Sequence, residues 1–269
     1  MSTDVQLSKW QKFRKTVFWE YTQVIVVALI LVFGFIRPFV VEAFKIPSGS
    51  MEDTLLVGDR ILVCKFIYGF KIPGTDIRVF DFHKPARGDV FVFIPPHEED
   101  RNFIKRIVAI EGDTVHTEGK TLYVNGKAVD DSAYTKHVGG HFSRRNDFPP
   151  FRQMQEYMRG NELYHDYTKT DSQFKREFPE GKPFTVPKRH VFAIGDNRNN
   201  SQDSRTWGPV PVDRIKGQAF MVYWSFCNDK DRHVECKNEN VKIWEVWKII
   251  GNIRFNRIGK LIHSQHGFN

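Results

Sequence analysis

The sequence predicts a mainly β protein with one helix near each end. Short apolar runs alternate with turns rich in Gly, Asp and Asn, and Phe, Val and Ile are frequent in these runs. One long apolar run lies before residue 40, and a helical spacing of apolar residues begins only after residue 240. The apolar fraction of 41% argues against a disordered chain, and 269 residues suffice for one large or two small domains.

The first element is an apolar run at residues 24–36. With its neighbours it forms a segment, 21–41, of about the ~20 residues that a bilayer needs. Basic residues in 1–20 then place the N-terminus in the cytoplasm and everything after Arg37 outside. The alternatives are a buried core helix or a cleavable signal peptide that ends at 41–43, but Pro38 and Glu42 make a poor cleavage region.

Five apolar runs separated by turn residues predict strands. They are residues 60–66, 90–94, 103–110, 121–124 and 191–194. Asn125-Gly126 between two such runs is a strong signal for a two-residue β-hairpin.

The remaining segments complete the predicted organisation. Residues 42–129 and 189–240 form a β domain, and the polar stretch 130–188 is a smaller, variable subdomain inserted in it. Residues 241–269 form an amphipathic C-terminal helix, with apolar residues on one face over 241–262. This helix either packs on the β domain or lies on a membrane surface.

Charge and cysteine content restrict the partners. The net charge of +8 suits an anionic partner, but the basic residues are dispersed and show no nucleic-acid-binding signature, so a lipid surface is favoured. No cysteine pattern indicates a metal site. Cys227 and Cys236 flank a polar stretch and form either a disulfide or two unrelated thiols, whereas Cys64 lies in an apolar run as a buried hydrophobe.

Three segments carry candidate chemistry. A loop with Ser48 and Ser50 offers a serine nucleophile, or is an ordinary turn. The histidines lie in polar, loop-like sequence, so the candidate base is Lys105, which shares a strand face with Phe103 and Ile107. Its alternative role is to protect an edge strand from aggregation.

The third segment is a dense polar turn at residues 195–205. Asp203 and Arg205 in this turn are spaced to pair, and Ser201 offers a hydroxyl to an amine. The alternative is a solvated loop, although its place after a strand end favours a site.

Together, the apolar run and residues 46–68, 87–93, 103–115 and 195–211 resemble bacterial signal peptidase I, a family of Ser/Lys serine endopeptidases. The P-S-x-S-M motif of that family implies that Ser50 is the nucleophile and that Ser48 contributes its hydroxyl to the oxyanion hole. The aromatic-I-K-R motif implies that Lys105 is the general base.

The last motif of the family, G-D-N-x-x-N-S-x-D-S-R, implies that Ser201 orients the lysine. It also implies a structural ion pair between Asp203 and Arg205. The resemblance implies a coiled-sheet β catalytic domain with a variable β subdomain, and an active site near the membrane surface.

The resemblance further implies a single-pass protein of the bacterial inner membrane that removes signal peptides from exported preproteins after an Ala-x-Ala site. It implies an acyl-enzyme intermediate, no cofactor and no metal, a monomer, and transient contact with the secretion translocon. Shallow apolar pockets would exclude large side chains. The residues implied to line them are Phe44, Ile46, Pro47, Met51, Leu55, Phe103 and Ile104.

Two features of the sequence leave questions. Asp53 stands where the family commonly has Pro, in S-M-x-P-T-L. Strand alternation turns Ile104 away from Lys105, so a bulge, or a pocket that wraps around the strand, is needed for both to face the substrate.

Competing functions also exist. A LexA-type self-cleaving protein lacks a membrane anchor, and a penicillin-binding acyl transferase needs S-x-x-K. A membrane-tethered, non-catalytic β domain for binding or assembly and a paralogue of narrow specificity are the remaining alternatives.

Overall fold

The protein is described from a computed structural model of the whole chain. The structure describes residues 17–36, 40–71, 78–79, 83–96, 98–137, 183–227 and 246–262. The chain forms two compact units, Met1–Glu42 and Ala43–Asn269.

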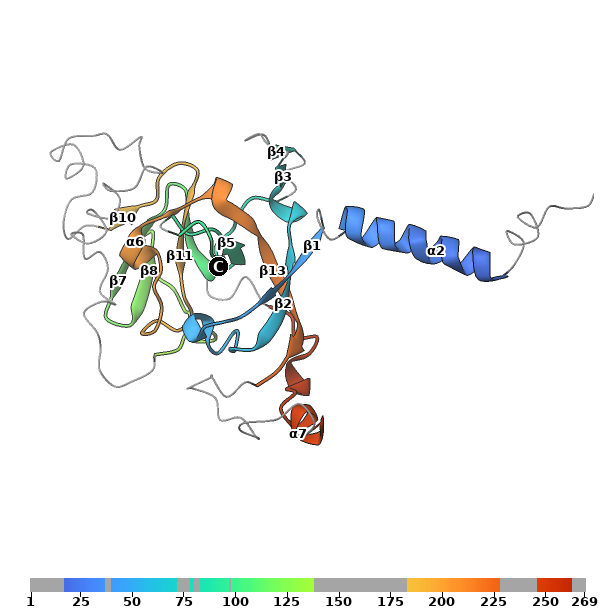
Figure 1. The fold of residues 1–269 in the computed structure, drawn as a ribbon. Coiled ribbons are helices and arrows are strands. Elements are labelled where there is room, and N and C mark those ends of the chain that lie inside the picture. Colours follow the sequence, from blue (N-terminus) through green and yellow to red (C-terminus); the bar gives the residue numbers. More distant parts are fainter. Residues whose placement is uncertain are drawn as a thin grey trace, which may run out of the picture. The chain divides into compact units, whose positions relative to one another are not determined.

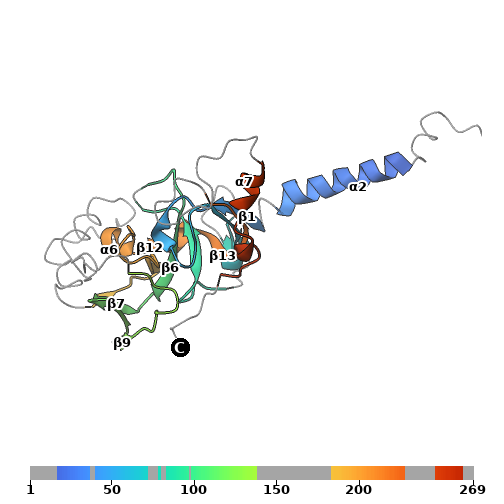
Figure 2. The ribbon, with the colours of Figure 1, turned by 90° about the horizontal axis from the view of Figure 1, so that it is seen from below.

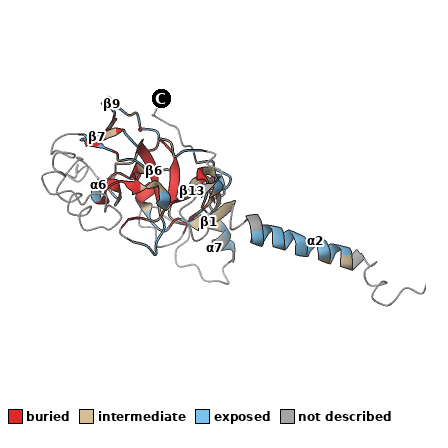
Figure 3. Cartoon of the chain, turned by 90° about the horizontal axis from the view of Figure 1, so that it is seen from above, coloured by how far each residue is buried: buried red, intermediate tan, exposed pale blue. Residues whose placement is uncertain are grey.

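The described part of the first unit is helical. Helix α2, Val17–Leu31, continues directly into a π-helical turn, Val32–Ile36. Its apolar side chains are exposed along most of its length (Figure 3). No helix in the described ranges combines the length and the apolarity needed to span a bilayer. The helix begins before the predicted segment 21–41. The last residue of that segment, Val41, is not helical, because it starts a strand at the edge of a sheet.

The second unit is built on one large sheet, with strand order β1-β2-β13-β5-β6-β11-β12 (Figures 1 and 2). The strands are β1 Val41–Lys45, β2 Asp59–Cys64, β5 Val90–Phe93, β6 Phe103–Ile110, β11 His190–Ile194, β12 Val210–Pro211 and β13 Ile215–Ser225. This agrees with the mainly β class that the sequence predicts. Strand β13 was not predicted, although it is the longest and pairs with both β2 and β5.

A second sheet has the order β10-β7-β8-β9. Its strands are β7 Thr114–Glu118, β8 Thr121–Val124, β9 Lys127–Ala128 and β10 Phe184–Thr185. The predicted hairpin is confirmed, since Val124 pairs with Lys127 and both Asn125 and Gly126 have positive φ, as a type I′ turn requires. Most of the predicted insertion, 138–182, lies outside the described residues, but its two ends take part in the folded unit.

Minor elements complete the unit. They are the strand pair β3 Phe70–Lys71 and β4 Arg78–Val79, helix α6 Ser204–Trp207, and 3-10 turns at Gly49–Met51, Phe66–Tyr68 and Val212–Arg214. Cys64 is a free thiol and Cys227 is disulfide-bonded, while its predicted partner Cys236 lies outside the described residues.

The core consists of three apolar clusters, and β6 contributes different side chains to each of them. Val108 packs with residues of the second sheet, Ile104 packs with β2 and the serine loop, and Ile107 packs with Phe91 and Trp207. Strand β6 is therefore central to the unit (Figure 3).

In the part of the chain that the structure describes, the C-terminal helix ends earlier than predicted. There, helix α7 covers Val246–Gly251, and a 3-10 turn follows at Phe255–Arg257. Residues 241–245 and 263–269 of the predicted helix lie outside the described residues. The chain then returns to β13, where Leu261 pairs with Met221. Two forces oppose a longer helix. Gly251 is a poor helix former, and the fully buried Asp59 carboxylate binds Arg257 at 2.6 Å, which draws the chain inward.

Candidate active site

Ser50 lies in the 3-10 turn Gly49–Met51, between β1 and β2. The segment before this turn is tied to β2, because the Ile46 N–H donates to the Asp59 carbonyl at 2.8 Å. Met51 is fully buried and anchors the turn in the core. Ser50 itself is 9% exposed and lines a pocket.

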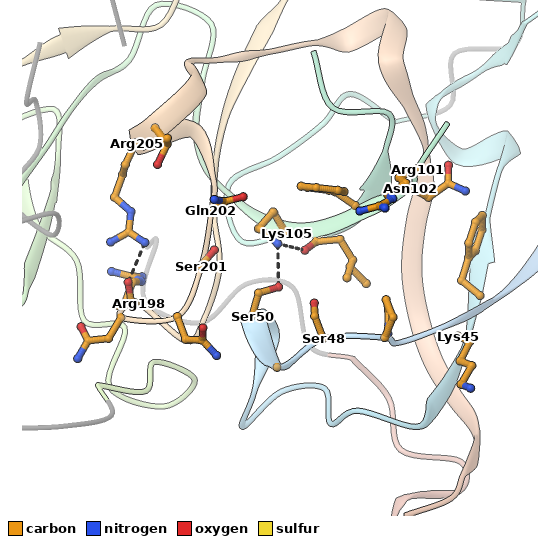
Figure 4. Close-up of a pocket in the computed structure, with 18 residues that line it drawn as sticks. Lys45, Ser48, Ser50, Arg101, Asn102, Lys105, Arg198, Ser201, Gln202 and Arg205 are labelled. Carbon is orange, nitrogen blue, oxygen red and sulfur yellow. Dashed lines mark hydrogen bonds between the residues drawn. The ribbon is translucent and has the colours of Figure 1, made fainter. Parts of the chain in front are cut away.

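Strand β6 brings Lys105 to this serine. Lys105 Nζ lies 2.8 Å from Ser50 Oγ and 2.9 Å from the Ile104 carbonyl oxygen (Figure 4). The predicted strand face is confirmed for Phe103, Lys105 and Ile107. Phe103 and Ile107, on either side of Lys105, pack in the same apolar cluster. The lysine side chain is almost completely buried, at 3% exposure.

The environment of Lys105 favours its neutral form. Burial lowers the pKa of Lys105 from its ordinary value of 10.5 to about 8, although the more distant carboxylates of Asp203 and Asp196 partly oppose this. About a tenth of such lysines are neutral at pH 7. A neutral amine in contact with a serine hydroxyl is what general-base activation of that serine requires.

The polar turn after β11 forms the opposite wall. A Cβ at Gly195 would lie 2.2 Å from Ser201 Oγ and 2.5 Å from the Ser50 carbonyl oxygen. Only glycine permits this close approach between the polar turn and the nucleophile turn. The Gly195 N–H donates to Asp203 at 3.0 Å, which fixes the start of the turn.

Asp203 and Arg205 form an ion pair at the base of this turn. Two hydrogen bonds of 2.8 Å join the Arg205 guanidinium to the Asp203 carboxylate, and the guanidinium also donates to the Arg198 carbonyl. Burial alone would raise the pKa of Asp203, but Arg205 lowers it below the ordinary value. The pair therefore remains charged and holds the turn.

The pocket between these walls has a volume of about 940 Å³. Ser50 and Lys105 lie in its middle, with Arg198 and Arg205 toward one end and Lys45 toward the other (Figure 4). Ser48 and Ser50 rise side by side from the loop toward Lys105.

The sequence did not indicate the buried ion pair of Arg106 and Asp196 behind the pocket. Arg106 donates to both carboxylate oxygens of Asp196, at 2.9 and 2.8 Å, and to the Gly88 carbonyl at 2.8 Å. The Thr54 hydroxyl donates to the same carboxylate at 2.6 Å. Arg106 follows Lys105 directly, yet nothing local in the sequence indicates a partner ninety residues away.

Asn197 was missed as well. It donates from its backbone N–H to the Ser50 carbonyl and from its side-chain amide to Gly49 and Glu52, all at 3.1 Å. Asn197 therefore clamps the nucleophile turn. Its place in the polar turn was the only sequence signal.

Known proteins are similar to this chain over most of its length. Residues 18–224 match the family model described as signal peptidase, peptidase S26. A signal peptidase I of Pseudomonas fluorescens is 40% identical over 74% of this chain and 70% of its own length, and one of Pseudomonas aeruginosa is 41% identical over 72% and 69%.

The chain belongs to the signal peptidase S26 family. It is therefore an enzyme, a serine endopeptidase. A signal peptidase I of Aquifex aeolicus is 35% identical over 73% of this chain and 81% of that protein. A crystal structure of a signal peptidase I from Enterococcus faecalis has 23% sequence identity and a TM-score of 0.30, and it covers 51% of this chain and 97% of the other.

The residues implied to form substrate pockets in this family divide into two groups. Phe44, Pro47, Phe103 and Ile104 line the pocket. Ile46, Met51 and Leu55 do not, because they are buried in the core cluster that also contains Ile104. That these three residues contact substrate remains a prediction.

The position of Ile104 answers one open question. Ile104 packs in a different apolar cluster from Phe103 and Ile107, so strand alternation is retained. Phe103, Ile104 and Lys105 nevertheless all line the pocket, so the pocket wraps around the start of β6.

Ser201 differs from its expected contact. Its buried hydroxyl interacts with the Asp203 carboxylate and helps to lower the pKa of that group, and no hydrogen bond joins Ser201 to Lys105 among the described residues. It lies close to the Ser50–Lys105 pair (Figure 4). That it orients the lysine remains a prediction.

Asp53, the departure from the family pattern, has φ of 83°. Proline is fixed near −65° and cannot adopt this conformation. The turn therefore follows a path that differs from the one a proline imposes. In the described part of the chain, no group of three or more His, Cys, Asp or Glu side chains is placed to hold a metal ion.

Proposed function

We propose that this serine endopeptidase removes N-terminal signal peptides from exported preproteins, with Ser50 as nucleophile and Lys105 as general base. The observation that supports it is the 2.8 Å contact between Ser50 Oγ and the nitrogen of a buried lysine whose pKa is lowered to about 8. The named relatives are signal peptidases I.

The first half of the reaction forms an acyl-enzyme. Neutral Lys105 takes the proton of the Ser50 hydroxyl while Ser50 Oγ attacks the scissile carbonyl. The resulting tetrahedral intermediate carries its negative charge on the former carbonyl oxygen. The Lys105 ammonium then gives its proton to the leaving amine, and the peptide C–N bond breaks. The amine leaves as the new N-terminus of the mature protein.

Deacylation repeats these steps with water. Neutral Lys105 removes a proton from a water molecule, which attacks the ester carbonyl of acylated Ser50. The ammonium returns the proton to Ser50 Oγ as the ester bond breaks, so the enzyme is regenerated and the signal peptide leaves as a carboxylate.

The proposed oxyanion hole has two donors. The Ser50 N–H lies in the first turn of a 3-10 helix, where N–H groups lack a partner within the helix. Ser48 is exposed, and its side chain does not cap that turn. Each donor of this kind is typically worth ~3 kcal/mol of transition-state stabilisation. Ser48→Ala should therefore lower kcat by about 10²-fold with little effect on KM.

The apolar end of the pocket fits small residues before the scissile bond. Phe44, Pro47 and Ile104 line this part, and Ile104 packs on the core residues Ile46, Met51 and Leu55. Exclusion by overlap is the physical basis for an Ala-x-Ala site.

Helix α2 is proposed to anchor the enzyme in the cytoplasmic membrane, with the catalytic unit outside. Its 15 residues continue into a five-residue π-turn, close to the length of about 20 residues that spans a bilayer. Val24, Ile25 and Leu31 are more than half exposed, which suits a lipid environment. If carbonate washing released the full chain from membranes, this proposal would fail.

The decisive experiment compares purified wild type, Ser50→Ala and the control Ser132→Ala on a preprotein with an Ala-x-Ala site. Ser132 is an exposed serine outside the pocket. We expect wild type and the control to cleave after the second Ala, as mapped by mass spectrometry, and Ser50→Ala to be inactive. Cleavage by Ser50→Ala would refute the nucleophile. A folded wild type that cleaves no such preprotein would favour a binding domain or a paralogue of narrow specificity.

A further inference from the structure

Glu52 is a buried carboxylate two residues after the nucleophile. Its side chain is 3% exposed, although most glutamates lie at the surface. Its backbone N–H donates to the Gly49 carbonyl at 3.1 Å, so Glu52 closes the same turn that presents Ser50. The burial of a carboxylate in this position is costly unless hydrogen-bond donors and a cation compensate its charge.

Two residues supply what this carboxylate needs. One oxygen accepts a hydrogen bond from the Asn197 side-chain amide at 3.1 Å, and the other lies 3.5 Å from Lys136 Nζ. Among the described residues, Lys136 is the one cation in ion-pair contact with Glu52. Lys136 also lies 3.4 Å from the Asp53 carboxylate, which is half exposed.

The backbone of Lys136 is fixed to the loop that clamps the serine turn. Its N–H donates to the Asp196 carbonyl at 2.9 Å, and its carbonyl accepts from the Arg198 N–H at 3.0 Å. Lys136 and Asn197 thus pair as neighbouring strands do. The lysine side chain starts from a rigid position beside the turn, as a positioning contact requires.

We infer that Lys136 is a positioning residue for Ser50, and that it acts through Glu52 and Asn197. By holding the Glu52 carboxylate in place, Lys136 keeps an acceptor aligned with one of the two amide hydrogens of Asn197. The other amide hydrogen is directed to Gly49, and the Asn197 N–H to Ser50. This inference rests on the proposed function, since it names a residue that sets the geometry of that reaction.

The inference also gives a role to the start of the predicted variable subdomain, 130–188. Lys136 precedes residues 138–182, yet it contacts the residue that follows Met51 in the nucleophile turn. The start of the predicted insertion is thereby part of the catalytic framework. A displacement of about 1 Å at a reacting atom can cost 10²-fold in rate, so a contact at this distance from the chemistry has a measurable effect.

The test measures kcat and KM for Lys136→Met, Lys136→Arg, Glu52→Gln and the Glu52→Gln/Lys136→Met double variant. Lys127→Met, at an exposed lysine of β9, is the matched control. We expect Lys136→Met to lower kcat by about 10- to 100-fold with KM changed by less than about threefold. Lys136→Arg should restore kcat to within about threefold, because it restores the charge.

The double variant separates positioning from simple packing. Glu52→Gln removes the buried charge and should itself lower kcat by a few fold, but a neutral amide needs no cation. Once Gln stands at 52, we expect Lys136→Met to cause no further loss. This comparison also remains valid if Lys136→Met alone fails to fold, because the double variant carries no uncompensated buried charge.

Three results would overturn the inference. They are an unchanged kcat in Lys136→Met, an equal loss in Lys136→Arg, and losses that multiply in the double variant. Ser50→Ala measured in parallel keeps the two proposals apart. If Ser50→Ala retained activity, the proposed function itself would fail, whereas a normal Lys136→Met beside an inactive Ser50→Ala would refute only the positioning role.

Discussion

Lys105 and Arg106 are neighbours on strand β6, carry the same charge and are both almost fully buried, at 3% and 1% exposure. Their surroundings differ in one respect. Arg106 binds both oxygens of Asp196, whereas no carboxylate in the described part of the chain is in ion-pair contact with Lys105. Among the described residues, the hydrogen-bond partners of Lys105 Nζ are the Ser50 hydroxyl and the Ile104 carbonyl.

This difference separates a reactive charge from a structural one. Burial alone would lower the pKa of Arg106 too, but Asp196 raises it above the ordinary value. Without such a partner, burial lowers the pKa of Lys105 to about 8. On the two faces of one strand, the pKa of one cation is thus lowered and the pKa of the other is raised. One can release a proton near neutral pH, and the other holds the loop that carries Asn197.

The largest effect is expected for Lys105→Met. The substitution keeps an unbranched apolar stem but removes the proposed base in contact with Ser50, so kcat/KM should fall by about 10⁴-fold or more. The melting temperature at pH 7 should not fall, since a buried ammonium is removed. Retention of more than a tenth of the activity, measured with a preprotein substrate, would rule out Lys105 as the base.

Arg106→Met should affect stability more than any other single change on this strand. It leaves the Asp196 carboxylate buried without its cation, which typically costs about 3–5 kcal/mol in the free energy of unfolding. Urea denaturation measures this loss, and Arg60→Met, at an exposed arginine of β2, is the control. Adding Asp196→Asn should recover part of it. If Arg106→Met matched the control, the two cations would not differ in the way described.

The pH dependence tests the Lys105 side of the comparison alone. Since the neutral amine is the active form, kcat/KM should rise with pH and reach half of its plateau near pH 8. In the unfolded chain the same lysine titrates near 10.5, so between pH 8 and 10.5 the unfolded state binds more protons. The free energy of unfolding should therefore rise with pH across this window, by about 3 kcal/mol in total.

Subtracting the curve of Lys105→Met removes the contributions of the other lysines and tyrosines that titrate there. The difference between wild type and this variant should increase only between pH 8 and 10.5. A flat difference, or an acid limb of kcat/KM centred below pH 7, would show that Lys105 is not the titrating group.

Much of this comparison was visible in the sequence. The bounds of β6 were predicted from apolar periodicity, and so was the shared face of Phe103, Lys105 and Ile107. The loop with Ser50 and the Asp203–Arg205 spacing were recognised through short local motifs. Local patterns suffice where a residue's role depends on neighbours within a few positions.

The rest depends on pairing at long range. Nothing near Arg106 indicates Asp196, and nothing near Glu52 indicates Lys136 or Asn197, because these contacts are set by the order of strands in the sheet. The C-terminal helix was predicted too long for a similar reason. The apolar residues there do have helical spacing, but Arg257 forms an ion pair with the buried Asp59 carboxylate, which draws the chain toward the core.

The smallest expected effects concern Tyr134, whose ring lies 4.0 Å from the Arg106 guanidinium. Its hydroxyl is buried and has no hydrogen-bond partner among the described residues. Tyr134→Phe keeps the ring and removes only this unpaired group, so the free energy of unfolding should change by less than about 0.5 kcal/mol. Tyr134→Leu removes the cation–π contact and should cost about 1–2 kcal/mol.

The two Tyr134 variants show how much of the stability of Arg106 comes from its carboxylate. If the Asp196 ion pair dominates, the cost of Tyr134→Leu stays well below that of Arg106→Met, and neither Tyr134 variant shifts the acid limb of kcat/KM. Equal costs for Tyr134→Leu and Arg106→Met would mean that the aromatic ring, and not the ion pair, holds Arg106 in place. The difference between Arg106 and Lys105 would then lie in how closely each cation packs against an aromatic ring, because Lys105 Nζ also lies near one, 5.5 Å from the centre of Phe103.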